Sequence, residues 1–482
     1  MSLRYLILLL TLILSACQPK KEGKLPNIVF ILIDDLGWND LTCYGSTFYE
    51  TPAIDQLARS GVRFTDAYAA ASICSPTRAS ILTGKSPARL NMTDWIPGSN
   101  PKNRPLLGAE DQHALPLSEI TFAERLKEEG YRTGFFGKWH LGGVGYLPED
   151  QGFDTNIGGH DAGQPATYFH PYQKGNKFDV PGLPGGEAGE YLTDRLTTES
   201  LQFIHENTDQ PFLLYLSHYA VHTPIEAKDS LVQKYRRKAT VQASAKDSAY
   251  HLERDHWTRQ DQNNPVYAAM VESVDQSVAR IRAELEMLGL AEETIIVFTS
   301  DNGGLTTLRN KRAPTAVRPL RAGKGWLYEG GIRVPLMISW PGKIEARISA
   351  DLTTSIDLYP TLLDLLGLDQ MPEQDLDGKS LSPQLTGRDK ASNRRLYWHF
   401  PHYHGSGSLP SAAIRMGDYK LIQFYEQDSV ELYDLSNDLS ETKNLVDSLP
   451  GKAKTLLREL QAWQAETGAQ LPKTNPAYNS SK

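Results

Sequence analysis

The chain is organised around residues 72–84, which have the sequence SICSPTRASILTG. Pro76 fits the first turn of a helix, because its missing N–H leaves no helical hydrogen bond unmade there. The residues after it favour a helix that ends at Gly84, so Cys74 is expected just before a helix N-terminus. Backbone N–H groups at that position favour an anion, and Arg78 follows one turn later on the same face. The segment therefore indicates an oxyanion site, although a cysteine taken alone is more often an inert core residue.

The same thirteen residues resemble the signature of the type I sulfatases, in which the cysteine is oxidised after translation to formylglycine. A second block, residues 130–142 with the sequence GYRTGFFGKWHLG, resembles the second signature of that family. The resemblance implies that Cys74 is converted to formylglycine, with a formylglycine-generating or sulfatase-maturing enzyme as a partner. The hydrated aldehyde would then attack the sulfur of a sulfate ester, and this covalent step would divide the hydrolysis into two easier steps.

The composition is that of a globular protein. Hydrophobic residues make up 40% of the 482 residues and charged residues 22%, which excludes a wholly disordered chain. The net charge is −8 and no run of Lys or Arg forms a basic stripe, so nucleic acid is not expected as a partner. The three cysteines, Cys17, Cys43 and Cys74, do not make a disulfide framework.

The N-terminus has the pattern of an export signal. Arg4 precedes an apolar run at residues 5–14, which is too short for a transmembrane helix. The end of this run, Leu14-Ser15-Ala16-Cys17, resembles a bacterial lipobox. The resemblance implies a lipoprotein signal peptide at residues 1–16, a lipidated Cys17 and a tether at residues 17–24. We expect the protein to be exported and anchored by its lipid (palmitate) in the bacterial cell envelope, at the periplasm or outer membrane; a plain secretory signal is the alternative.

Apolar runs alternate with amphipathic segments through the first three quarters of the chain. Residues 27–33 and 294–298 are typical of buried parallel strands, whereas residues 118–130 and 267–288 are typical of amphipathic helices. This alternation predicts an α/β domain with a mostly parallel central sheet at residues 25–370.

The pattern changes in residues 371–482, where four short strand candidates precede one helix candidate at residues 452–464. This order predicts a small C-terminal antiparallel sheet with one packed helix. The resemblance to type I sulfatases implies the same architecture, an alkaline-phosphatase-like α/β sandwich followed by a small C-terminal antiparallel sheet.

Oxygen-bearing side chains follow two of the predicted strands directly. Asp34 and Asp35 come after the first strand, and Asp301 and Asn302 come after the strand at 294–298. Open α/β sheets bind ligands at the carboxyl ends of their strands. Carboxylate and amide oxygens suit a hard cation, Ca²⁺ more readily than Mg²⁺ at an irregular site. The family resemblance assigns the metal to these four residues and to the residue derived from Cys74.

The resemblance also assigns the catalytic side chains. Arg78 and Lys138 correspond to residues that hold the formylglycine and the metal-bound oxygens. His140 corresponds to the base that accepts a proton from the diol. His222 and Lys324 correspond to residues that contact the sulfate, and the acid for the leaving group is expected among them.

The substrate must be recognised by other residues. An exported, lipid-anchored hydrolase meets polymers from outside, so a sulfated polysaccharide fragment is the expected carbohydrate substrate. His402 and His404 follow a strand candidate and precede a flexible Gly-Ser-Gly segment, so we expect them to contact the sugar.

Two other functions are open at this point. A phosphatase or phosphodiesterase of the same superfamily would use a Ser, Thr or unmodified Cys nucleophile, often with zinc. A non-catalytic lipoprotein that binds sulfated glycans would keep the scaffold but lose the nucleophile or a metal ligand, and this chain retains both. The oxygen-rich ligand set and the Cys-x-Pro-x-Arg segment favour a sulfatase.

Overall fold

The computed structural model describes residues 25–99, 101, 103–175, 180–183, 185–241, 249–370, 374–387 and 394–479. The predicted signal peptide, Cys17 and the tether lie outside these residues. Among the described residues, the helices are all too short or too polar to span a lipid bilayer.

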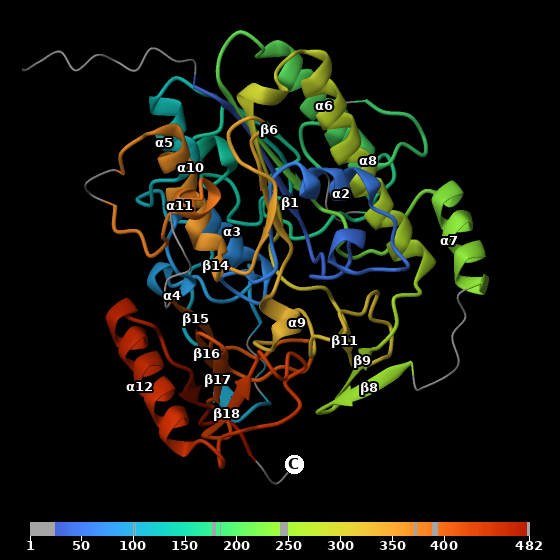
Figure 1. The fold of residues 1–482 in the computed structure, drawn as a ribbon. Helices are drawn as coiled ribbons and strands as arrows, with labels where there is room; N and C mark the ends of the chain where they lie inside the picture. Colours follow the sequence, from blue (N-terminus) through green and yellow to red (C-terminus); the bar gives the residue numbers. More distant parts are fainter. Residues whose placement is uncertain are drawn as a thin grey trace, which may run out of the picture.

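An eight-stranded sheet forms the centre of the larger part of the molecule (Figure 1). Its strands are, in spatial order, β13 (Arg347–Ser349), β2 (Val62–Phe64), β12 (Leu336–Ser339), β10 (Thr294–Ser300), β1 (Asn27–Ile33), β7 (Phe212–His218), β5 (Arg132–Gly137) and β6 (Thr155–Ile157). Within this sheet, among the described residues, the pairs that β12 makes with β2 and β10 are antiparallel and the other pairs are parallel. The predicted α/β fold with a mostly parallel sheet is therefore confirmed.

Helices cover both faces of this sheet. One face is covered by α2 (Pro52–Arg59), α6 (Leu192–Glu206) and α8 (Pro265–Met287), with α7 (Asp229–Val241) packed outside α8. The other face is covered by α3 (Cys74–Thr83), α5 (Phe122–Glu128) and α10 (Leu358–Leu366).

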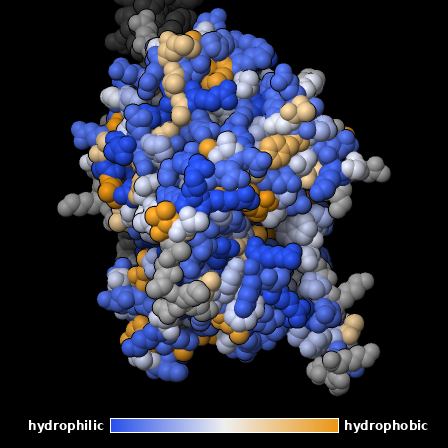
Figure 2. Space-filling view, turned by 90° about the vertical axis from the view of Figure 1, so that its right-hand side faces the viewer, coloured by the Kyte–Doolittle hydropathy of each residue, from blue (hydrophilic) through white to orange (hydrophobic). Residues whose placement is uncertain are grey.

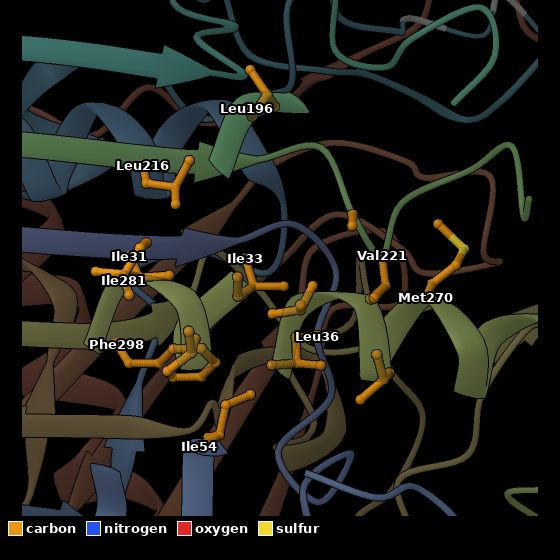
Figure 3. Close-up of a cluster of buried hydrophobic side chains, with 14 of the residues drawn as sticks. Ile31, Ile33, Leu36, Ile54, Leu196, Leu216, Val221, Met270, Ile281 and Phe298 are labelled. Carbon is orange, nitrogen blue, oxygen red and sulfur yellow. The ribbon is translucent and has the colours of Figure 1, made fainter. Parts of the chain in front are cut away.

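The side chains of β1 alternate between these two layers. Ile31 and Ile33 pack with the α8 layer, as Figure 3 shows, whereas Phe30 and Leu32 pack with the α3 layer. Burying each of these side chains contributes roughly 1.5–3 kcal/mol of transfer free energy. A strand buried on both faces is held firmly, so the residues at its carboxyl end have fixed positions.

The smaller part of the molecule is an antiparallel sheet with one packed helix, as predicted, and it lies below the α/β body in Figure 1. Its elements are β15 (Arg395–Phe400), β16 (Ser411–Met416), β17 (Tyr419–Phe424), β18 (Ser429–Asp434) and α12 (Pro450–Thr467). Ala412 and Ile414 of β16 face α12, whereas Ala413 faces the α/β body.

Short elements complete the chain. They are β3 (Ala67–Tyr68) paired with β14 (Thr353–Thr354), β4 (Leu106–Leu107) paired with β19 (Lys473–Thr474), a sheet of β8 (Tyr250–Glu253), β9 (His256–Arg259) and β11 (Thr307–Leu308), the helices α4 (Pro87–Leu90), α9 (Glu329–Ile332) and α11 (Ser382–Leu385), and 3-10 helices at Thr42–Tyr44, Pro148–Gln151, Ala291–Glu293 and Ser355–Asp357. Leu381, just before α11, and Leu385 within it pack in the same apolar cluster as α10, so this segment is attached to the α/β body.

Candidate active site

The two acidic segments meet at one edge of the central sheet. β1 and β10 are parallel neighbours whose last residues, Ile33 and Ser300, are paired in register. The backbone N–H of Asp35 donates to Asp301 Oδ1 at 3.2 Å. Asn302 Nδ2 donates to Asp35 Oδ1 at 2.8 Å. The two apolar strands thus bring the expected metal ligands together in a buried position.

Cys74 lies beside this cluster. Its Sγ donates to Asp34 Oδ1 at 3.6 Å and accepts from Lys324 Nζ at 3.3 Å. The helix begins at Cys74 itself, one residue earlier than predicted, because Ile73 is the extended residue that precedes it and Pro76 is accommodated in the first turn. Burial raises the pKa of the Cys74 thiol to about 12, with the nearby lysines opposing the shift.

Three cations are paired with the three carboxylates. Lys138 Nζ donates to Asp34 Oδ2 at 2.7 Å, and Lys324 Nζ contacts Asp35 Oδ1 at 2.6 Å. Arg78 Nε donates to Asp301 Oδ2 at 2.8 Å. Buried charges need such partners, since an unpaired buried charge is strongly destabilising. Although burial raises the pKa of Asp34 to about 7, Arg78 and Lys138 outweigh burial at Asp301 and lower its pKa.

The guanidinium group of Arg78 makes its hydrogen bonds to other protein groups of the site. Its Nη1 donates to the Lys138 carbonyl at 2.8 Å and to Ser217 Oγ at 2.7 Å. This arrangement makes Arg78 a residue that positions Asp301 and the loop after β5. Ser217 was not identified from the sequence; the signal was its place near the carboxyl end of the buried strand β7.

The two predicted catalytic histidines are neutral. His140 Nε2 lies 2.6 Å from the Ile96 carbonyl, so this nitrogen carries the proton and Nδ1 is left as an acceptor. Burial lowers the pKa of His140 well below its ordinary value, and Lys138 adds to the effect. Burial, together with Lys324, lowers the pKa of His222 to about 3.

Several acceptor atoms at this site lack a donor. Asp35 Oδ2 and Asn302 Oδ1 are buried and have no hydrogen-bond partner. His222 Nδ1 lies 3.0 Å from the Thr223 carbonyl and so carries the proton, which leaves Nε2 as an acceptor 3.7 Å from Asp35 Oδ2. Ligand atoms of Asp34, Asp35, Cys74 and His222 lie within 4.8 Å of one another. Acceptors that face one another without a hydrogen between them fit a divalent cation.

A cavity of about 570 Å³ opens beside Cys74. Cys74, His140, His222, Lys324 and His404 are among its lining residues. The other lining residues are the apolar Ile73, Trp95, Ile96, Pro97 and Ala162, together with Asp161, Gly163 and Gln164. Sequence reasoning missed the lining residues at 95–97 and 161–164, because residues 85–116 and 142–190 have no periodic pattern.

The structure separates the two histidines that were expected to contact the sugar. His404 lines the cavity, as expected. His402 is 3% exposed, contacts Thr93 Oγ1 at 2.8 Å and is absent from the cavity wall. The expectation for His402 is therefore corrected: its ring is enclosed by the loop that contains Thr93 and Asp94, which keeps it from direct contact with a ligand in this cavity.

Comparison with known proteins identifies the family of this chain. The sulfatase family model matches residues 26–368, and the model for the C-terminal region of N-sulphoglucosamine sulphohydrolase matches residues 322–466. The chain belongs to the sulfatase family. It is 33% identical to human arylsulfatase A, over 96% of this chain and 90% of that protein. It is also 32% identical to a sulfatase from Formosa agariphila, over 96% of this chain and 93% of that protein.

Solved structures give the same result. The crystal structure of Ps i-CgsB in complex with k-i-k-neocarrahexaose is similar with a TM-score of 0.74 and 29% identity, over 95% of this chain and 96% of that one. The predicted sulfatase resemblance is thereby confirmed. The chain is a sulfuric ester hydrolase with an alkaline-phosphatase-like α/β sandwich and a small C-terminal sheet.

Proposed function

We propose that this sulfatase is exported and releases sulfate from sulfated saccharides through a formylglycine residue formed from Cys74. The observation that carries the proposal is the position of Cys74: it lines the cavity while its Sγ lies within 3.6 Å of Asp34 and 3.3 Å of Lys324. A group formed here is held among charged side chains that can bind an oxyanion.

Formylglycine formation is supported by the segment that contains Cys74. Residues 74–78 read Cys-Ser-Pro-Thr-Arg, which matches the pattern in which this family's cysteine is oxidised. A partner enzyme that matures sulfatases is part of this proposal. The hydrate of the aldehyde would supply a hydroxyl nucleophile, which a buried, protonated thiol cannot supply.

The metal is proposed to be Ca²⁺, with Mg²⁺ as an alternative. Asp34, Asp35, Asp301, Asn302 and the residue derived from Cys74 would hold it, and the unpartnered oxygens of Asp35 and Asn302 support this set. When bound, such an ion polarises the oxygens of a sulfate ester.

The other residues have roles that follow from their contacts. Lys324 and His222 line the cavity next to Cys74 and are placed to contact the sulfate group. His140 is neutral with Nδ1 unprotonated, so it is suited to accept a proton. Lys138 and Arg78 hold Asp34 and Asp301 in place, and their charges oppose the effect of burial on these carboxylates.

A saccharide substrate is supported by the shape of the cavity and by relatives. Trp95 is half-buried and is one of the residues that line the cavity, and sugar-binding sites commonly contain such an aromatic ring. His404 lies on the same cavity. Among the relatives, canine N-acetylgalactosamine-6-sulfatase is 30% identical over 92% of this chain. The solved structure of Ps i-CgsB contains a carrahexaose.

Export and lipid anchoring rest on the N-terminal sequence alone. Residues 14–17, Leu-Ser-Ala-Cys, support acylation of Cys17 and a place in the cell envelope, at the periplasm or outer membrane. We expect the full-length protein in the membrane fraction and released by detergent, and a Cys17→Ser variant in the soluble fraction or uncleaved. Identical fractionation of both proteins would contradict the lipid anchor.

The proposed function is tested by a substrate screen. Purified mature protein is incubated with defined sulfated mono- and oligosaccharides, a small aryl sulfate and a matched aryl phosphate, and released sulfate or phosphate is measured. The Cys74→Ala variant is the blank, and Cys43→Ala, at a half-buried cysteine outside the site, is the matched control. We expect sulfate release from at least one saccharide, abolished only in Cys74→Ala. Faster release of phosphate than of sulfate would contradict the proposal.

A further inference from the structure

A second cavity of about 530 Å³ lies between the β8–β9 hairpin, the segment 317–322 and residues 440–442. Its wall contains Arg259, Arg318 and Arg321, and the apolar side chains of Leu252 and Pro319 lie beside them. The hairpin belongs to the side of the molecule that faces the viewer in Figure 2, where the surface is mainly hydrophilic.

The charges of this cavity do not cancel. Arg321 is neutralised by Glu253, whose oxygens it contacts at 2.8 and 2.9 Å. Glu441 also lines the cavity, but it is paired with Lys420 at 2.9 Å.

The other two arginines keep their charge available. Each guanidinium nitrogen of Arg259 donates to a neutral acceptor: Nε to the Asp261 carbonyl and Nη1 to the Ala313 carbonyl, each at 3.0 Å, and Nη2 to Asn263 Oδ1, so its charge has no acidic partner in the part of the chain that the structure describes. Arg318 is exposed, and its guanidinium has no ion pair with any described residue. Two positive charges are therefore left without an acidic partner in one cavity.

This arginine cavity lies close to the catalytic cavity. Arg321 lines the first and Lys324 the second, and three residues of chain separate their Cα atoms by at most about 11 Å. Strand β9 makes a second connection. It begins at His256, which packs against Gly407 near His404, and ends at Arg259, about 10 Å further on.

We propose that the arginine cavity binds a second anionic group of the same saccharide whose scissile sulfate ester occupies the catalytic cavity. The ligand class is an oligosaccharide with at least two sulfate or carboxylate groups. The exposed Arg318 holds the second anion, the unpaired charge of Arg259 attracts it, and Leu252 and Pro319 contact the face of a sugar ring. This inference rests on the proposed saccharide sulfatase function, and it adds a preference for multiply charged substrates.

The test compares Arg318→Gln with Arg312→Gln. Arg312 is an exposed arginine six residues away that does not line the cavity, so its substitution removes the same charge without touching the site. Each variant is assayed on an oligosaccharide with two or more sulfates and on a small aryl sulfate, which is too short to reach the arginine cavity. We expect Arg318→Gln to raise KM for the oligosaccharide about five- to tenfold with little change in kcat, and Arg318→Glu to raise it further. Arg312→Gln is expected to match the wild type.

Equal KM values for Arg318→Gln and Arg312→Gln on the oligosaccharide would overturn this proposal. The proposed function would remain intact in that case, because the substrate screen tests it separately through the release of sulfate from saccharides.

A binding measurement separates a saccharide from a free anion. Protein carrying Cys74→Ala, with and without Arg318→Gln, is titrated calorimetrically with the oligosaccharide and with sodium sulfate. We expect Arg318→Gln to weaken binding of the oligosaccharide by about the same factor as KM. If it weakens the binding of inorganic sulfate only, the cavity is a free-anion site and the saccharide proposal is wrong.

Discussion

Two clusters of buried charge in this molecule differ in how completely they are satisfied. In the active site, Asp35 Oδ1 accepts a hydrogen bond from Asn302 and forms an ion pair with Lys324, whereas Asp35 Oδ2 is buried without a hydrogen-bond donor. The junction carboxylate Glu329, between the α/β body and the C-terminal sheet, is equally buried. Its Oε1 receives Lys420 at 2.9 Å, and its Oε2 receives Arg333 and Tyr68, each at 2.7 Å.

The difference teaches how to distinguish a ligand site from a structural network. At the junction both oxygens of Glu329 accept hydrogen bonds from side chains of the protein, and the bond from Lys420 joins β17 to α9, so the role of Glu329 is to fix the two parts of the molecule together. The active-site cluster leaves acceptors unused beside a cavity, and leaving a buried polar atom unmatched costs about 1–3 kcal/mol. Such a cost is retained where a ligand makes the missing contact.

Removal of the metal should have the largest effect, and it should act on the active-site cluster. We expect a chelator to abolish sulfate release, because the unpartnered oxygens of Asp35 and Asn302 then lose their cation. Calcium should restore activity better than zinc, since the ligand set is mainly oxygen. Metal analysis of the active protein provides the check, and fully active protein without a divalent cation would contradict the assignment.

Lys420→Met should break the junction cluster while leaving the active site intact. The substitution leaves Glu329 and Glu441 short of a partner, so we expect the free energy of unfolding to fall by about 3–5 kcal/mol in denaturant titrations. Lys473→Met is the matched control. Lys473 is 67% exposed and paired with an exposed Glu110, so its loss should leave the free energy of unfolding nearly unchanged. Equal losses would show that the junction pair is not a buried network.

The position of the active-site cluster was predictable from the sequence in part. The apolar runs of β1 and β10 predicted two buried strands of a parallel sheet, and Asp34, Asp35, Asp301 and Asn302 follow directly from their ends. That the two strands are neighbours is shown by the structure. Local signals also located most elements, but their ends shifted. The helix expected at residues 118–130 begins at Phe122, because Thr121 and Glu124 form a capping box there.

The parts of the site that depend on loops were not predictable. Trp95, Ile96 and Gln164 reach the cavity from long segments without periodicity, and no local pattern reports where such segments fold back. Residues 62–68 form two short strands, β2 and β3, and not one continuous strand. Polar Thr65 and Asp66 interrupt the apolar pattern, and β3 pairs with β14 from another sheet.

Substitution of His404, which lines the catalytic cavity, should have a smaller effect than removal of the metal or loss of Lys420. We expect His404→Ala to reduce kcat/KM on a sulfated oligosaccharide about tenfold more than on a small aryl sulfate, because only the larger substrate reaches this wall. His402→Ala is the matched control, since His402 is enclosed and should affect both substrates equally. Equal losses on both substrates for His404→Ala would assign this loop to stability or catalysis.

The central claim is that active protein carries formylglycine at position 74, and peptide mass spectrometry tests it most directly. Trypsin should release residues 64–78 as one peptide, because Arg78 is its only Lys or Arg. In a sample whose sulfate release has just been measured, we predict that Cys74 has lost sulfur and two hydrogens and gained one oxygen. A fully active sample in which Cys74 is an unmodified thiol would contradict the account.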